Sequence, residues 1–224
     1  MRQLLLAFLL CSLSMVAFAQ KNTMSTAADS DPQATAILDK LRSKYENLKA
    51  VQASFSLIIE IPEQAKEVQK GTLAQAGDQF RLTLNDQTFI SDGKTIWLHL
   101  KNNNEVQIMD ATENSGEFLS PRDLMQIYEQ ENFVYALTNQ LQEGNKLIEQ
   151  IEFKPLDDNS DYSKLRLSVD KRKNEIVRIK AFGKDGARYT MRIDQWNANT
   201  NFPANHFTFD TKAFPDIYVE DLRY

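Results

Sequence analysis

FISDGKTIWLHL, residues 89–100, places two short apolar runs on either side of Asp92-Gly93. Asp-Gly between alternating hydrophobic residues is a strong signal for a β-hairpin, because both central positions of the tight turn need a positive φ. A two-residue turn at this point would pair Phe89 with Ile96. One face of the hairpin would then carry Phe89, Ile96, Leu98 and Leu100, and the other Ile90, Thr95, Trp97 and His99. The first face is the more continuously apolar, so the pattern predicts that it is buried.

Alternating patterns continue on both sides of this hairpin. Upstream, residues 51–61, 68–75 and 80–84 have the two-residue period of strands with one buried face. Downstream, the further candidate strands are residues 105–109, 133–140, 146–154, 162–169, 175–182, 188–196, 206–209 and 217–220. We therefore predict about ten or eleven strands, and no repeat or linker divides the chain.

Two helices are also expected. Asp31 and Pro32 have the residue types of an N-cap and a first helical position. An apolar stripe follows at helical spacing, made of Ala34, Ile37, Leu38, Leu41, Tyr45 and Leu48. Ser120 and Pro121 repeat the start signal, and the short apolar side of that second helix would be Leu124, Ile127 and Tyr128. Such helices need an apolar surface to lie on, so they are expected to cover one face of the sheet.

The N-terminus is typical of an exported protein. Arg2 precedes the apolar run 4–13, and Ala17-Phe18-Ala19 is a small-x-small cleavage site. We interpret residues 1–19 as a signal peptide, with an uncleaved anchor as the alternative. Residues 20–31 are expected to be a flexible lead-in, and residues 32–224 a single domain.

Composition narrows the possible functions. Removal of residues 1–19 would leave no cysteine, so the exported chain could not use disulfides and would need an ordinary core. Arg2 is one of 26 basic residues, so 25 would remain against 31 acidic ones, a net charge of −6. This charge argues against nucleic acid as a partner and against binding to an anionic membrane by charge.

No pattern for catalysis or metal binding is present. The two histidines, His99 and His206, lie in no metal-binding spacing, and no nucleophile elbow, P-loop or Rossmann fingerprint occurs. Asp157, Asn159 and Asp161 imitate the start of a calcium loop. The glycine and glutamate of such a loop are missing, so a polar hairpin tip is the better interpretation. We predict no cofactor, no metal and no catalytic residue.

Four stretches carry a family resemblance. They are FRLTL (80–84) leading into FISDGKTIWLHL, FLSPRDLM (118–125), GKDGARYTMRI (183–193) and FTFDTKAFPDIYVEDLR (207–223). Together they resemble the outer-membrane lipoprotein carrier family, the LolA-type periplasmic chaperones. The resemblance extends from about residue 33 to the end of the sequence.

The resemblance implies an unclosed antiparallel β half-barrel, mainly β with α, whose concave apolar face lies under a helical lid. It implies a monomeric periplasmic carrier of acylated lipoproteins. Such a carrier receives its cargo from an inner-membrane lipoprotein-releasing ABC transporter and delivers it to an outer-membrane acceptor without covalent chemistry. The alternatives are a lipid-binding sensor or regulatory domain on the same half-barrel, a lipid hydrolase, and a structural domain in which the apolar alternation is solid core.

From the periodicity and the resemblance, we predict a lipid-binding cavity between the sheet and the helices. Its expected lining is Leu38, Leu41, Phe55, Leu57, Phe80, Leu82, Leu84, Phe89, Ile96, Leu98, Leu124 and Ile127. One feature departs from the family. Its members often carry an Arg-Pro pair, linked to lid closure, where this chain has residues 75–78 (QAGD). Arg81 stands at a commonly basic position, but the lid role is not assigned to it.

Overall fold

The computed structural model describes residues 26–111 and 132–223. Their strands form one open sheet in the order β12-β6-β5-β4-β3-β2-β1-β11-β10-β9-β8-β7. The strands are β1 (Val51–Glu60), β2 (Glu67–Ala76), β3 (Gln79–Leu84), β4 (Gln87–Ser91), β5 (Thr95–Leu100), β6 (Glu105–Asp110), β7 (Phe133–Glu143), β8 (Lys146–Pro155), β9 (Tyr162–Asp170), β10 (Glu175–Gly183), β11 (Arg188–Ala198) and β12 (Tyr218–Asp221). The helices are α1 (Pro32–Glu46) and the 3₁₀ turns η1 (Ala27–Asp29), η2 (Lys101–Asn103) and η3 (Thr211–Ala213).

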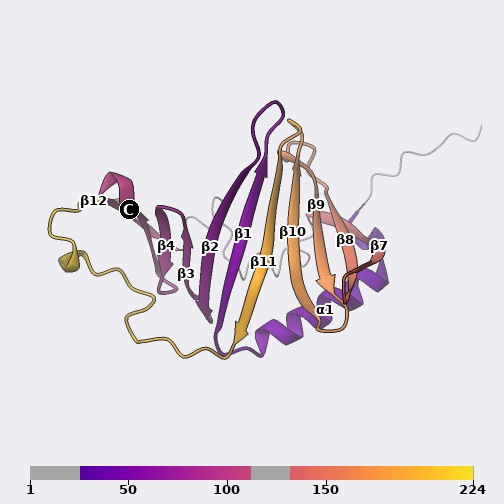
Figure 1. Cartoon of the computed structure of the whole chain (residues 1–224), viewed down its shortest axis with the longest axis horizontal. Coiled ribbons are helices and arrows are strands. Elements are labelled where there is room, and N and C mark those ends of the chain that lie inside the picture. The colour runs from indigo at the N-terminus through magenta and orange to yellow at the C-terminus, as the bar shows by residue number, and fades with distance from the viewer. Residues whose placement is uncertain (1–25, 112–131, 224) are drawn as a thin grey trace, which may run out of the picture.

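The sheet is a half-barrel, because its two ends, β7 and β12, do not meet (Figure 1). Pairing of β1 with β11, in which Val51 faces Ala198, joins the N-terminal strands to the C-terminal ones. This confirms the predicted unclosed half-barrel with a helix on its concave face. The structure adds one feature that the alternation did not predict: β12 lies parallel to β6.

Helix α1 begins and packs as its sequence predicts. The Asp31 carboxylate caps it by accepting a hydrogen bond from the Gln33 amide at 2.8 Å. Its stripe, with Leu38 and Leu41 only 3% exposed, packs against Tyr135, Ile151, Phe153, Leu167, Val169 and Ile176 of β7–β10. The described helices include none long and apolar enough to cross a membrane. The second predicted helix lies outside the described residues.

The central hairpin keeps its predicted faces but shifts its register. Phe89 pairs with Leu98 instead of Ile96, a shift of two residues in the partner strand, so the predicted two-residue turn becomes a four-residue turn, residues 92–95. The cause is Asp92, whose carboxylate accepts hydrogen bonds from the amides of Lys94 and Thr95, each at 2.8 Å. Asp92 is therefore the first residue of this turn, and Gly93 within it has the positive φ of +92°. An even shift leaves every side chain on its predicted face.

The predicted strand at residues 206–209 is wrong. This part of the chain crosses the convex face of the sheet without joining it. Its backbone carbonyls bind Arg81 instead of another strand: Nε of Arg81 donates to the His206 oxygen at 2.7 Å. The alternation that indicated a strand arises because Phe207 is buried while Phe209 packs against His99 at 5.1 Å between ring centroids.

The two halves of the sheet differ in which face is covered by another segment of the chain. In β7–β10 the concave face is buried under α1. In β2–β6 the convex face is buried beneath the C-terminal segment, residues 199–217, and the buried side chains there are Ala74, Ile90, Val106, Ile108 and Phe207. The concave face of β2–β6 also buries Phe80 and Ile96, but it leaves Leu82, Leu84, Phe89 and Leu98 partly exposed.

Candidate functional site

The strand register places eight of the predicted lining residues on one continuous surface. Leu82 on β3 pairs with Leu73 on β2 and with Phe89 on β4, and Phe89 pairs with Leu98 on β5. Directly opposed residues of an antiparallel pair share a face. By the same register, the concave face carries Phe55, Leu57, Phe80, Leu82, Leu84, Phe89, Ile96 and Leu98.

These eight residues differ in exposure. Phe55, Phe80 and Ile96 are buried, at 3–5% exposed. The others, Leu57, Leu82, Leu84, Phe89 and Leu98, are partly exposed. The concave face of β1–β5 is thus an apolar surface that remains accessible. We call it the concave apolar surface.

The remaining predicted residues lie elsewhere. Leu38 and Leu41 belong to the core between α1 and β7–β10, where they contact no open surface. Leu124 and Ile127 lie outside the described residues. Whether all twelve line one lipid cavity therefore stays a prediction.

Two apolar residues on this side were not predicted: Leu73, a member of the concave apolar surface, and Met191, which extends that surface onto β11. Leu73 pairs with both Leu82 and Ala53, and Met191 pairs with Leu57. Both lie in strands whose positions were predicted. Their alternation carried the signal, but which strands lie next to one another could not be derived from it.

A glycine in the middle of β2 makes room for an aromatic ring. Gly71 lies between Phe55 on β1 and Leu84 on β3. A Cβ at this position would stand 2.3 Å from Cζ of Phe55 and 2.7 Å from the Thr83 carbonyl oxygen. Any larger residue would therefore displace the Phe55 ring from the sheet.

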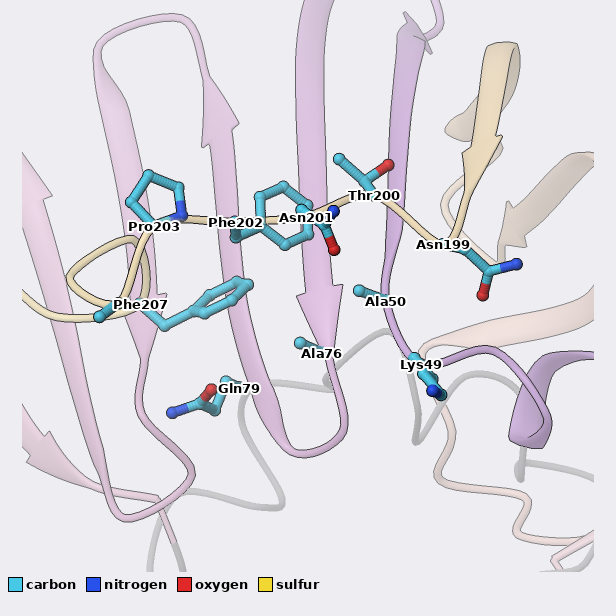
Figure 2. A pocket seen from close by; sticks show the side chains of 11 residues that line it. Lys49, Ala50, Ala76, Gln79, Asn199, Thr200, Asn201, Phe202, Pro203 and Phe207 are labelled. Atoms are coloured by element: carbon cyan, nitrogen blue, oxygen red, sulfur yellow. The ribbon is translucent and has the colours of Figure 1, made fainter.

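Two pockets among the described residues are formed mainly by residues outside the concave apolar surface, although Phe55 also lines the second one. The first, of about 560 Å³, lies between the C-terminal segment and the ends of β1–β3 (Figure 2). In it Phe202, Pro203 and Phe207 face Ala50, Ala76 and Gln79, with Lys49 at the rim. The second, of about 650 Å³, lies over β1–β3 and β11, and Lys70, Arg192 and Asp194 are among the residues that line it.

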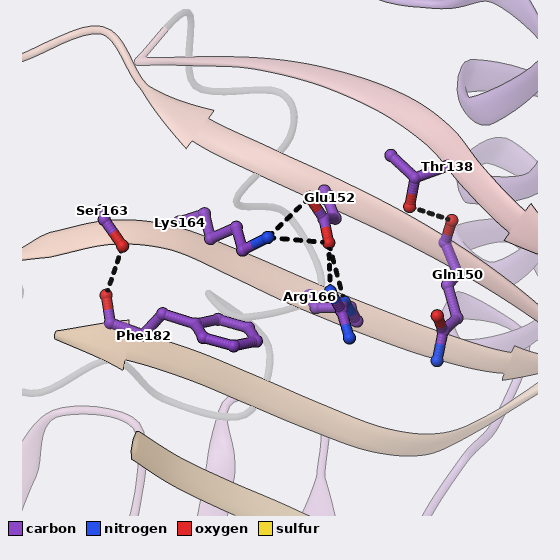
Figure 3. A network of polar contacts seen from close by, with 7 residues as sticks. All are labelled: Thr138, Gln150, Glu152, Ser163, Lys164, Arg166 and Phe182. Carbon is purple, nitrogen blue, oxygen red and sulfur yellow. Dashed lines mark hydrogen bonds and ion pairs between the residues drawn. The ribbon is translucent and has the colours of Figure 1, made fainter. Parts of the chain in front are cut away.

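The convex face of β8–β10 is charged instead of apolar. Glu152 accepts hydrogen bonds from Lys164 and Arg166, and both cations lie about 5 Å from the Phe182 ring (Figure 3). Burial acts to raise the pKa of Glu152, but the hydrogen bonds from Arg166 and Lys164 outweigh it, so the pKa is lowered. This face is therefore a solvated, ion-paired surface.

The histidines and Arg81 take structural positions. His206 stacks on Phe202 at 4.6 Å, and His99 packs against Phe209 and Phe214. Burial, followed by the charge of Arg81, lowers the pKa of His206. Arg81 itself points to the convex face, where it binds the C-terminal segment. It cannot contact a ligand on the concave apolar surface.

Two further hydrogen bonds fix the β8–β9 turn and the end of α1. Asp157 accepts a hydrogen bond from the Asn159 amide at 2.8 Å, as in a polar turn between β8 and β9. Tyr45 of α1 accepts one from the Ile176 amide at 3.1 Å, and burial raises the pKa of Tyr45 to about 12. The first interaction fits the predicted hairpin tip, and the second fixes the end of α1 against β10.

An open half-barrel with a helix on its concave side and an accessible apolar surface beside that helix defines a class of apolar-ligand-binding proteins. The family described as outer membrane lipoprotein carrier protein LolA matches residues 46–210. The chain therefore belongs to this family, whose members are binding and carrier proteins.

Several solved structures are similar to this chain at low sequence identity. An uncharacterized conserved protein from Thermus thermophilus has a TM-score of 0.57 at 12% identity, covering 84% of this chain and 99% of that one. A LolA superfamily protein from Nitrosomonas europaea has a TM-score of 0.43 at 12% identity, covering 79% and 98%. A putative outer membrane lipoprotein-sorting protein domain from Vibrio parahaemolyticus has 0.44 at 14%, covering 77% and 95%. No curated protein matches the sequence significantly.

Proposed function

We propose that this protein is a periplasmic carrier that shields the acyl chains of lipoproteins and moves them from the inner to the outer membrane. The observation that supports this most is the concave apolar surface. Strands β2–β6 bury Ile90, Val106 and Ile108 on their convex side, yet they keep Leu82, Leu84 and Phe89 partly exposed on the other. Partly exposed leucines beside the buried Phe80 and Ile96 contribute less to stability than fully buried ones would, because part of their apolar area is still in water.

The energetics suit a cargo that must be both held and released. Hiding an acyl chain from water is worth about 0.8 kcal/mol per CH₂ group. Apolar contacts are not directional, so a chain can leave along the same surface once a partner offers a better site. In this proposal the cargo comes from an inner-membrane lipoprotein-releasing ABC transporter and passes to an outer-membrane acceptor. No covalent step is involved.

Leu84→Glu tests the proposal, with Thr83→Glu as its matched control. The two residues are neighbours on β3, but Leu84 belongs to the concave apolar surface and Thr83 to the opposite face. A carboxylate among acyl chains costs several kcal/mol unless it is paired or protonated, so Leu84→Glu should weaken lipopeptide binding by roughly a hundredfold or more. Thr83→Glu should bind like the wild type, and both variants should melt as folded proteins.

Two results would contradict the carrier. A Leu84→Glu protein that no longer folds would mean that the concave apolar surface is core. Unchanged binding by a folded Leu84→Glu protein would mean that the acyl chains go elsewhere. Binding is measured with an acylated peptide, and folding by thermal melts of the same preparations.

Transfer between membranes separates a carrier from a lipid-binding sensor. The acidic chain should not sediment with plain anionic liposomes, since a basic residue gains about 1 kcal/mol at such a surface and the net charge here is negative. It should be captured by membranes that contain the lipoprotein-releasing transporter, and it should deliver lipoprotein to acceptor vesicles. Equal binding to both kinds of membrane, without delivery, would indicate a lipid-binding module instead.

A further inference from the structure

The two edge strands of the open sheet, β7 and β12, differ in whether other segments form hydrogen bonds with their outward backbone groups. At β7 the N-terminal segment forms hydrogen bonds with backbone groups of the edge strand. The Asp31 amide donates to the Tyr135 carbonyl oxygen at 2.9 Å. The Leu137 amide donates to the Asp31 carboxylate at 3.1 Å. The stretch of this edge at residues 135–137 is therefore closed to another strand.

The β12 edge is open. The amides of Tyr218 and Leu222 donate to the Asn104 and Ile108 carbonyls of the β6 side at 2.9 and 2.8 Å. In a parallel pair alternate residues point toward the partner strand, so the backbone groups of Val219 and Asp221 point away from β6. Among the described residues, no backbone group pairs with these two. Such an edge can accept one more strand.

The side chains along this edge are unusually exposed for their type. Tyr218 is 64% exposed, Val219 42% and Leu222 40%. An exposed strand edge with apolar side chains favours pairing with another chain. The strand is only four residues long, so a peptide added there would be held over a short stretch.

The concave side changes from apolar to acidic at the same place. The row Leu82–Phe89–Leu98 continues across β6 and β12 as Gln107 and Glu220. Gln107 donates to Glu105 at 2.8 Å and to Glu220 at 3.0 Å, which holds the two carboxylates together. A lipoprotein also changes from apolar to polar along its length, because its acyl chains are attached to the first residue of a polypeptide.

We propose that the β12 edge receives, as an added strand, the polypeptide segment that follows the acylated residue of a lipoprotein. This inference rests on the proposed carrier function and goes further by giving the carrier a contact with the cargo's backbone. The carboxylates of Glu105 and Glu220 favour basic side chains in that segment. They also disfavour a second copy of β12 on the edge, since it would bring the same acidic residues together.

The test uses three synthetic ligands. The first is a triacylated cysteine followed by Ser-Lys-Lys-Lys-Lys, the second replaces each lysine by glutamate, and the third is the triacylated cysteine amide with no tail. The wild type should bind the lysine-tailed ligand on the order of tenfold more tightly than the tailless one, as one or two added hydrogen bonds and charge pairs would give. Hydrogen exchange at the Val219 and Asp221 amides should slow only with that ligand.

Val219→Pro removes the outward amide, with Val219→Ala as the matched control. Proline is tolerated on an edge strand where the N–H faces solvent, so pairing of β12 with β6 should persist. Protection of the Leu222 amide checks this. Val219→Pro should lose most of the gain from the lysine tail, while Val219→Ala keeps it.

The outcomes separate the two proposals. Equal binding of all three ligands by the wild type would overturn the added strand and leave the carrier standing. If a folded Val219→Pro protein still bound the lysine-tailed ligand more tightly than the tailless one, the added strand would also be overturned, since charge alone would then explain the preference. Failure to bind any of the acylated ligands would overturn the carrier, and the added strand with it.

Discussion

Ile151 on β8 and Leu82 on β3 both point to the concave side of the same sheet, yet their surroundings differ. Ile151 is fully buried beneath α1, while Leu82 is partly exposed. On the convex side the order is reversed, because β8 carries Glu152 and its ion pairs, and β4 carries the buried Ile90. One half of the sheet thus buries its concave face under α1, while the other leaves part of that face accessible.

The comparison predicts unequal costs for truncating these two residues. Ile151→Ala should lower the free energy of unfolding by about 2–5 kcal/mol, the range for a fully buried aliphatic side chain. Leu82→Ala should cost less than half as much, because part of that side chain is already in water. Urea denaturation of the two variants measures both values. Equal losses would show that the concave face of β3 is core after all.

Gly71→Ala tests the packing near the boundary between the two halves. It should lower the free energy of unfolding by less than Ile151→Ala does. The added methyl group would collide with the Phe55 ring and the Thr83 carbonyl, and overpacking of this kind costs about 1–3 kcal/mol. Because the ring is a side chain that can be shortened, Gly71→Ala combined with Phe55→Leu should recover part of the loss relative to Gly71→Ala alone. A double-mutant cycle with no coupling between the two sites would contradict this contact.

The sequence was most informative where one local rule applied. The alternation around Asp92-Gly93 placed Phe89, Ile96 and Leu98 on one face, and this survived a shifted turn because the shift was even. The Asp31-Pro32 signal located the start of α1. These predictions depend only on residues close together in the chain.

The sequence was less informative where distant segments meet. Nothing in the pattern of residues 206–209 distinguishes a strand from a segment laid across a sheet, since both alternate buried and exposed side chains. The backbone carbonyl of His206 accepts a hydrogen bond from Arg81, a residue distant in the sequence, and not from a neighbouring strand. Likewise, Leu38 and Leu82 are both apolar at the expected period, but only the fold assigns one to the core and the other to the concave apolar surface.

Acidification should affect the two halves differently, and this is the smallest effect we predict. Both histidines of the chain lie on the convex side of β2–β6. Burial, followed by nearby positive charge from Arg81 for His206 and from Lys101 and Arg81 for His99, lowers both pKa values. An unfolded histidine has a pKa of about 6.5. The stability gained from keeping them neutral is therefore present above about pH 6.5 and is lost as the pH falls through the folded-state pKa values.

The measurement is the melting temperature between pH 7.5 and 5.5, a range chosen because the carboxylates Glu152 and Asp194 have lowered pKa values and stay ionised there. The wild type should lose stability toward pH 5.5, and His206→Gln should show a shallower dependence, whatever its stability at pH 7.5. Hydrogen exchange should rise first around Phe207, where the C-terminal segment covers the sheet, while the amides of β8 under α1 remain protected. A pH dependence that is the same in both proteins would mean that His206 does not sense the acid. Faster exchange beginning at β8 would place the weaker half of the sheet under α1 and reverse the comparison.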